Sequence, residues 1–161
     1  LMLVPPGQLG ESVWNPFIRP RTVRRQEKEF QRKAIGVLEF LELSQHADEP
    51  AGDLSGGQKK LLELGRTLMT NPRIVLLDEP GAGVNRTLLK RLASAIKTLQ
   101  EDRGLAFLVI EHDMDFVMRL CTPIIVMSEG SVLMQGDPDV VQRDQRVLDA
   151  YLGGQYVATD G

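Results

Sequence analysis

The stretch DLSGGQKKLLELGRTLMTNPRIVLLDEP, residues 53–80, decides the fold of this chain. It predicts a helix that opens at Ser55 and runs to about Met69, because Asn71 and Pro72 disfavour its continuation. The run RIVLLD then predicts a short strand, since a continuous apolar run is typical of a strand buried on both faces of a parallel sheet. A helix followed by such a strand favours an α/β layered fold.

Helices and strands alternate along the rest of the chain as well. Before the stretch, we expect an irregular lead-in over residues 1–20, a helix over 21–43 and a loop up to Asp53. After it, we expect a helix capped by Asn85 and closed by Gly104, a strand in LAFLVIE, a short helix in DMDFVMRL, two strands around the turn Ser128-Glu129-Gly130, and a helical tail from Asp137 that frays between Gln155 and Gly161. This order predicts an α/β fold with a mainly parallel sheet.

Composition narrows the class of protein. The chain has 161 residues, 42% of them hydrophobic and 25% charged, which is enough for a packed core. Its net charge of -3 gives no general attraction to nucleic acid or anionic lipid. No apolar run reaches the roughly 18 to 20 residues that span a bilayer, and the first residues show no secretory signal pattern. The single cysteine, Cys121, excludes an internal disulfide and is expected to be a small buried residue.

The first strand ends in two adjacent acids, Asp78 and Glu79. Because ligands bind beyond the carboxyl ends of parallel strands, we expect Asp78 to face a ligand crevice. Neighbouring strand residues point in different directions, so one carboxylate can hold Mg²⁺, directly or through water, while the other orients an attacking water. An acidic strand end that only caps the next turn is the alternative interpretation.

The segment LSGGQ opens the helix that precedes this strand. Ser55 can accept hydrogen bonds from the turn that begins at Gly56 or Gly57. Glycines let an anion approach the backbone closely, and the free N–H groups at a helix start form a natural phosphate site. An ordinary helix cap with flexible glycines is the alternative.

The order and spacing of four motifs resemble the ATP-binding cassette (ABC) ATPases. LSGGQ resembles the signature motif of that family, IVLLDE its Walker B motif, GAGVN its D-loop, and His112, after the second strand, its switch histidine. The wording of these segments, together with VIEHDMDFVMRLC and VLDAYLGG, is similar to the ATP-binding subunits of branched-chain amino acid importers. Urea and amide importers share these features. Arg86 departs from the pattern, since the family usually has proline there.

The resemblance implies a role for each motif residue. Glu79 is expected to polarise the attacking water and His112 to reach the γ-phosphate, which makes these two the expected catalytic residues. Asp78 is expected to support Mg²⁺. The signature segment is expected to touch the ATP held by an opposite subunit. The nucleotide-binding residues implied in this way are Ser55, Gly56, Gly57, Gln58, Asp78 and Asn85.

The resemblance also implies that this chain is the C-terminal portion of such a subunit. The sequence contains no Walker A loop, G-x-x-x-x-G-K-[ST], and it begins with Leu1. We expect residues 1–72 to be a helical subdomain with the signature motif and residues 73–161 to be the second half of the ATPase core. Without the Walker A lysine, the chain is expected to bind ATP weakly or not at all and not to hydrolyse it. Its apolar strands are expected to be less covered and to favour self-association.

Ligands and partners are implied in the same way. They are ATP with Mg²⁺, a second ATP-binding subunit, transmembrane permease subunits and, indirectly, a solute-binding protein, with no nucleic acid. The expected location is the cytoplasmic face of the cell membrane. Trp14 and Phe17 are candidates for the docking surface, and His46 is expected to be an ordinary surface histidine.

Three other functions remain open. One is the ATPase of a urea or amide importer, and another is a non-transport ABC ATPase of DNA repair or translation. The last is an interaction domain that keeps the motifs without hydrolysis. Coiled-coil insertions or duplicated cassettes, usual in the non-transport class, do not occur in the sequence, and the intact Glu79 and His112 disfavour the non-catalytic interpretation.

Overall fold

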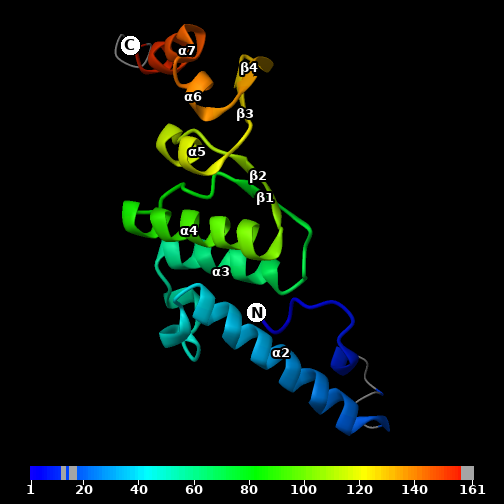
Figure 1. Ribbon diagram of the computed structural model, residues 1–161. Helices are drawn as coiled ribbons and strands as arrows, with labels where there is room; N and C mark the ends of the chain where they lie inside the picture. The colour runs from blue at the N-terminus through cyan, green and yellow to red at the C-terminus, as the bar shows by residue number, and fades with distance from the viewer. Residues whose placement is uncertain (12–13, 15–17, 157–161) are drawn as a thin grey trace. The chain divides into compact units, whose positions relative to one another are not determined.

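The structure is a computed structural model that describes residues 1–11, 14 and 18–156 (Figure 1). Phe17, one of the two docking candidates, lies outside the described residues. The elements, in which η marks a 3-10 helix, are η1 (Leu9–Glu11), α2 (Pro20–Phe40), η2 (Ser44–His46), η3 (Ala51–Asp53), α3 (Gly56–Leu68), β1 (Ile74–Asp78), α4 (Arg86–Arg103), β2 (Ala106–Ile110), α5 (Met114–Leu120), β3 (Ile124–Ser128), β4 (Ser131–Gly136), α6 (Pro138–Val141) and α7 (Gln145–Tyr156).

The chain divides into two units, Leu1–Leu108 and Val109–Gly161, and each is described by itself. The first holds the long helices, and the second holds a hairpin with three short helices around it. The expected functional division at residue 72 stays a prediction. No helix in the described ranges is both long and apolar enough to cross a membrane.

The helix α2 ends at Phe40, three residues earlier than the sequence pattern predicts. Glu42 adopts the left-handed region with φ 55°, and the Leu43 N–H donates to the Leu38 carbonyl at 2.8 Å. This closing geometry caps the last carbonyls of a helix and reverses the chain. The reversal buries Leu41 and Leu43, which are only 3% and 2% exposed, so core packing decides where this helix ends.

The lead-in is held to α2 by one amide side chain. Oε1 of Gln26 accepts a hydrogen bond from the Leu9 N–H at 2.8 Å, and its Nε2 donates to the Gly7 carbonyl at 3.0 Å. Apart from η1 and the helical residue Ile18, whose N–H donates to the Trp14 carbonyl at 3.0 Å, the described part of residues 1–19 is irregular, as expected.

In the first unit α3 packs against α2 on one side and against α4 on the other (Figure 1). Their buried apolar residues lie at helical spacing: Val23, Ala34, Val37, Leu61, Leu64, Leu68, Leu92, Ile96 and Leu99. Gly65 permits a close approach, because a Cβ there would lie 2.8 Å from Cδ1 of Leu41 and 3.0 Å from Cγ1 of Val37.

The end of α3 is fixed by a lysine from α2. Lys33 Nζ donates to the Met69 carbonyl at 2.8 Å and to Oδ1 of Asn71 at 2.7 Å. Asn71 adopts φ 53°, a conformation that asparagine tolerates, so it and Pro72 stop the helix together. Burial, with a smaller contribution from Arg103, lowers the pKa of Lys33.

The strands β1 and β2 form a two-stranded sheet. They are parallel, because the N–H of Ala106, which opens β2, donates to the carbonyl of Arg73, directly before β1. The prediction that these strands are buried on both faces is wrong. Val75 is 3% exposed, but Ile74, Leu76 and Leu108 are 55%, 69% and 51% exposed. One face packs on the core, whereas the other stays apolar and open, which agrees with the expectation of less covered strands.

The second unit is built on the antiparallel hairpin of β3 and β4. Its turn uses Glu129 and Gly130, both at positive φ, as a two-residue hairpin turn requires. The hairpin residue Ile124 packs with Val141 and Val147 of α6 and α7. Cys121 lies half-buried beside this cluster, and burial raises the pKa of its thiol, which suits a packing role.

The helical tail is divided into α6 and α7. Oδ1 of Asp144 accepts a hydrogen bond from the Arg146 N–H at 2.9 Å and so caps a new helix. The expectation that the chain frays from Gln155 is wrong for two residues, because α7 continues to Tyr156. Residues 157–161 lie outside the described residues.

Candidate functional site

The signature segment forms a capping box at the start of α3. The Gln58 N–H donates to Oγ of Ser55 at 3.4 Å, and the Ser55 N–H donates to Oε1 of Gln58 at 2.8 Å. This reciprocal pairing satisfies two N–H groups that a helix start leaves open. The expected cap at Ser55 is confirmed.

The two glycines of the signature segment differ in their surroundings. Gly57 is buried, and a Cβ there would lie 2.4 Å from Cδ1 and 3.2 Å from Cβ of Leu88 on α4. Gly56 is exposed, and the nearest atom to its Cβ position is the Gly83 carbonyl oxygen at 3.9 Å. The start of α3 therefore lies beside the D-loop segment. Packing alone explains Gly57, whereas Gly56 leaves room for a ligand.

Asn85 of the D-loop segment caps α4. Its Oδ1 accepts a hydrogen bond from the Leu88 N–H at 2.9 Å, and the side chain is exposed. Arg86 is the first residue of α4, a position where proline is favoured because the N–H has no partner within the helix. Arginine there costs no helical hydrogen bond, so this departure from the family pattern is compatible with the fold.

The carboxylates of Asp78 and Glu79 lie at the carboxyl end of β1, and both residues are exposed. Glu79 adopts φ 43°, the left-handed region, and its carbonyl accepts from the Ala82 N–H at 3.1 Å. Positive φ in a non-glycine residue is uncommon and gathers at functional sites. The strand therefore ends at Asp78, and Glu79 begins the turn that follows it.

A single exposed carboxylate suits Mg²⁺ that arrives with a nucleotide. In the described part of the chain no three His, Cys, Asp or Glu side chains gather into a metal site. Mg²⁺ commonly keeps its waters and binds through one or two carboxylates and phosphate oxygens. Asp78 fits that donor set, and the exposed start of α3 fits the phosphates.

His112 belongs to the second unit, whereas the two acids belong to the first. It lies between β2 and α5, with its side chain 77% exposed. Its N–H donates to Oε2 of Glu111 at 3.0 Å, and the Asp113 N–H approaches the same oxygen at 3.4 Å. The Glu111 side chain is only 1% exposed, so a buried carboxylate holds the histidine backbone. The approach of His112 to Glu79 stays a prediction.

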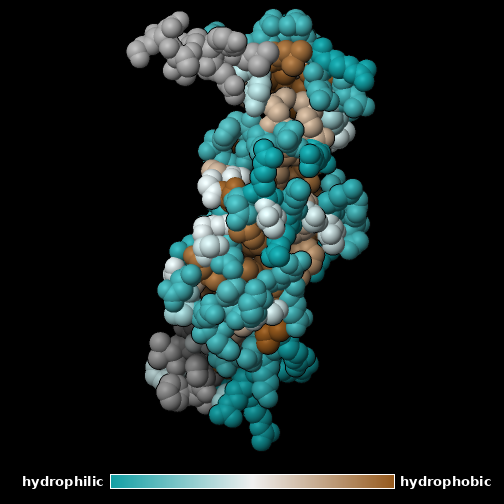
Figure 2. Space-filling model, turned by 90° about the vertical axis from the view of Figure 1, so that its left-hand side faces the viewer, coloured by the Kyte–Doolittle hydropathy of each residue, from teal (hydrophilic) through white to brown (hydrophobic). Residues whose placement is uncertain are grey.

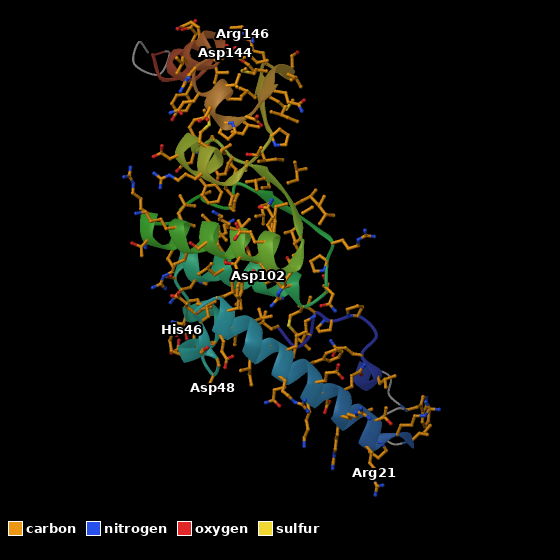
Figure 3. The ribbon with its side chains drawn as sticks, viewed as in Figure 1. Arg21, His46, Asp48, Asp102, Asp144 and Arg146 are labelled. Carbon is orange, nitrogen blue, oxygen red and sulfur yellow. The ribbon has the colours of Figure 1, made fainter. Side chains whose placement is uncertain are left out.

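His46 is not the ordinary surface histidine that the sequence suggests. It is half-buried, and its ring contacts Gln58 of the signature segment on one side and Glu49 on the other. Figure 3 labels it beside the loop before α3. No spacing rule links residue 46 to residue 58, so only the folded loop discloses this contact.

Trp14 is 71% exposed, which leaves it open as a docking residue. Other apolar side chains also reach the surface, and Figure 2 shows one face on which they interrupt the polar residues. Exposure alone assigns no partner.

Comparison with protein families gives two matches. A family model described as "ABC transporter" matches residues 8–82. A model described as "Branched-chain amino acid ATP-binding cassette transporter" matches residues 131–157. The first match includes the signature segment and the strand tip, and the second begins with β4.

Several curated relatives are named as branched-chain amino acid transport ATP-binding proteins. The probable LivG protein of Methanocaldococcus jannaschii is 38% identical over 148 residues, which cover 89% of this chain and 57% of the relative. LivG of Escherichia coli (strain K12) is 33% identical over 153 residues, covering 95% and 60%. BraF of Pseudomonas aeruginosa is 39% identical over 130 residues, covering 81% and 51%. The chain thus spans between 51% and 60% of the length of these relatives.

Solved structures give the same result. The ADP conformation of an ATP-binding cassette of an ABC transporter is 40% identical, with a TM-score of 0.69 over 76% of this chain and 49% of that one. A nucleotide-free cassette is 34% identical, with a TM-score of 0.65 over 89% and 60%. These are P-loop NTPase folds. The chain is therefore similar to the ATP-binding cassettes of ABC transporters, and among them to the branched-chain amino acid group.

Proposed function

We propose that this chain supplies the signature, Walker B and switch-histidine parts of an ATP-hydrolysing subunit in an ABC importer of branched-chain amino acids. One observation carries the proposal: an exposed, capped helix start lies in the same unit as a strand tip that bears two carboxylates. The similarity to named branched-chain amino acid transport proteins supports the choice of solute.

The signature turn would bind phosphate through its backbone. The N–H groups at the start of α3 and the helix dipole favour an anion, and exposed Ser55 and Gly56 leave that end accessible. A phosphate held by a second subunit would complete the contact. ATP would then favour a closed pair over an open pair, because ADP lacks the γ-phosphate.

The strand tip would provide the acids of the reaction. Asp78 would hold Mg²⁺, directly or through water, and that ion would neutralise charge on the phosphates. Glu79 would accept a proton from the attacking water, and His112 would orient that water and contact the γ-phosphate. Asn85, besides its capping role, would lie at the interface with the nucleotide.

The partners follow from the importer assignment. A second ATP-binding subunit, permease subunits and a solute-binding protein would complete the assembly, with this subunit on the cytoplasmic face of the membrane. The exposed Trp14 is a docking candidate toward the permease.

A chimera tests the proposed chemistry. The matched segment of the Methanocaldococcus jannaschii relative is replaced by these 161 residues, so that the relative supplies the preceding part. We expect the chimera to hydrolyse Mg-ATP, and Glu79→Gln to lower kcat at least about a hundredfold while nucleotide binding remains, because the proton acceptor is lost. A folded, nucleotide-binding chimera with no hydrolysis, or with full activity after Glu79→Gln, would refute the proposal.

The 161-residue chain alone provides the contrasting measurement. Because its sequence contains no Walker A loop, calorimetric titration with Mg-ATP is expected to show no micromolar binding. Micromolar binding would mean that the signature turn and the strand tip hold a nucleotide without that loop.

A further inference from the structure

A histidine outside the four motifs contacts the signature glutamine. His46 ends η2, and its Nε2 lies 2.8 Å from Nε2 of Gln58. Its Nδ1 lies 2.7 Å from Oε2 of Glu49. All three residues belong to the first unit, and Figure 3 labels His46 on the loop that leads to α3.

The backbone of Ser55 fixes which way the Gln58 amide points. A backbone N–H can only donate, so the Gln58 atom 2.8 Å from the Ser55 nitrogen is the amide oxygen Oε1. The NH₂ group of Gln58 is then the group that faces His46. A flipped amide would place two donors against each other at Ser55.

This orientation determines the proton position on His46. An NH₂ group has only donors to offer, so Nε2 of His46 must accept its hydrogen bond. The proton of the neutral ring must therefore sit on Nδ1, where it is donated to the carboxylate of Glu49. Each of the three contacts in the series Glu49, His46, Gln58 and Ser55 then joins one donor to one acceptor.

We propose that His46 is a positioning residue of the signature turn. In its Nδ1–H form it holds the amide of Gln58, and the amide holds the Ser55 backbone at the start of α3. The role in ATP hydrolysis rests on the proposed function, whereas the proton position and the hydrogen bond do not. If His46 is removed, Gln58 loses one of its two side-chain partners and the turn that meets phosphate is held less firmly.

Nitrogen NMR on the 161-residue chain tests the geometry without nucleotide. The chain has two histidines, so His112 of the second unit is an internal reference. At alkaline pH, where imidazoles are neutral, we expect the Nδ1–H tautomer at His46 and a nitrogen–nitrogen coupling across the hydrogen bond to Gln58. We expect Gln58→Ala to abolish the coupling and leave the His112 signals unchanged. An Nε2–H tautomer at His46, or no coupling in the unmodified chain, would overturn the inference.

Kinetics of the chimera test the positioning role. We expect His46→Ala to lower kcat for ATP hydrolysis about fivefold, the effect of one lost hydrogen bond, with KM nearly unchanged. His46→Gln places an amide oxygen near the Nε2 position and should restore most of kcat. Gln45→Ala is the matched control, because Gln45 lies in the same short helix and its Nε2 donates to the Glu42 carbonyl at 3.3 Å rather than to the signature segment.

Two outcomes would contradict the positioning role. One is an unchanged kcat in His46→Ala, and the other is an equal loss of kcat in Gln45→Ala, which would indicate general loosening of the loop. A folded, nucleotide-binding chimera that hydrolyses no ATP would refute the proposed function, while the NMR result would still decide the hydrogen bond.

Discussion

The start of α3 and the strand β1 lie in the same unit but differ in how completely they are packed. The start of α3 is fixed by its capping box, by the close approach of Gly57 to Leu88 and by the contact of Gln58 with His46. The sheet buries Val75 but leaves Leu76 of the same strand 69% exposed. The helix start is held by contacts from its own first turn, from α4 and from the loop before it, whereas the sheet has an apolar face that nothing in the described residues covers.

The largest effect on stability should come from a charge on the buried face of β1, compared with the same charge on its open face. Val75→Asp would bury an unpaired carboxylate and should lower the free energy of unfolding of the 161-residue chain by at least about 3 kcal/mol. Leu76→Asp, the matched control on the open face, should cost less than about 1 kcal/mol. Urea titrations followed by circular dichroism measure both.

The same pair of variants also tests self-association. Leu76→Asp should reduce it, because exposed apolar strands favour pairing between chains. Light scattering measures this change. Equal destabilisation by the two substitutions would show that the open face is covered in solution, and the contrast with the start of α3 would then fail.

The two signature glycines give the next effect. Gly57→Ala would force a Cβ against Leu88 and should cost about 1–3 kcal/mol in unfolding free energy. At Gly56 the nearest atom to an added Cβ lies 3.9 Å away, so Gly56→Ala should leave the unfolding free energy nearly unchanged or raise it slightly. If Gly57→Ala is tolerated like Gly56→Ala, the helices α3 and α4 do not pack as closely as the structure shows.

The smallest effect concerns the pH dependence of two helix caps. Ser55 caps α3 with a hydroxyl, whereas Asp144 caps α7 with a carboxylate whose pKa is lowered to about 2, chiefly by a hydrogen bond from Arg146. A lowered pKa means that the folded state favours the charged form, so this stabilisation is present above about pH 4 and is lost as the pH falls toward 2.

Asp144→Asn should therefore flatten the acid limb of the thermal unfolding midpoint measured between about pH 5 and 2. Ser55→Ala should lower the midpoint by a similar amount at every pH. An unchanged acid limb in Asp144→Asn would show that the cap contributes nothing to stability.

Local chemistry made much of the fold predictable. The caps at Ser55 and Asn85, the stop at Asn71 and the Ser128–Gly130 turn each depend on a few neighbouring residues, and the structure has all of them. The early end of α2 was not predictable, since it accompanies the burial of Leu41, whose Cδ1 lies beside Gly65 of α3. The division of the tail into α6 and α7 depends on the cap that Asp144 forms. In the sequence, Asp144 looks like any other surface aspartate.

The candidate site, like the fold, was predictable where it depends on neighbouring residues and not where it depends on distant ones. The motif residues were found from their order and spacing, and the family matches agree with that reading. His46 and the buried Glu111 carried no spacing signal, because their contacts arise only after the loops have folded. The roles of Asp78, Glu79 and His112 in hydrolysis remain predictions.

By itself, the sequence determined which segments are helices and strands, and which residues have the chemistry to bind phosphate and polarise water, because these properties depend on neighbouring residues. Only the tertiary structure decided which face of β1 is buried, why Gly57 must be glycine and what His46 contacts. Those features depend on the distance between atoms far apart in the chain, and packing alone sets that distance.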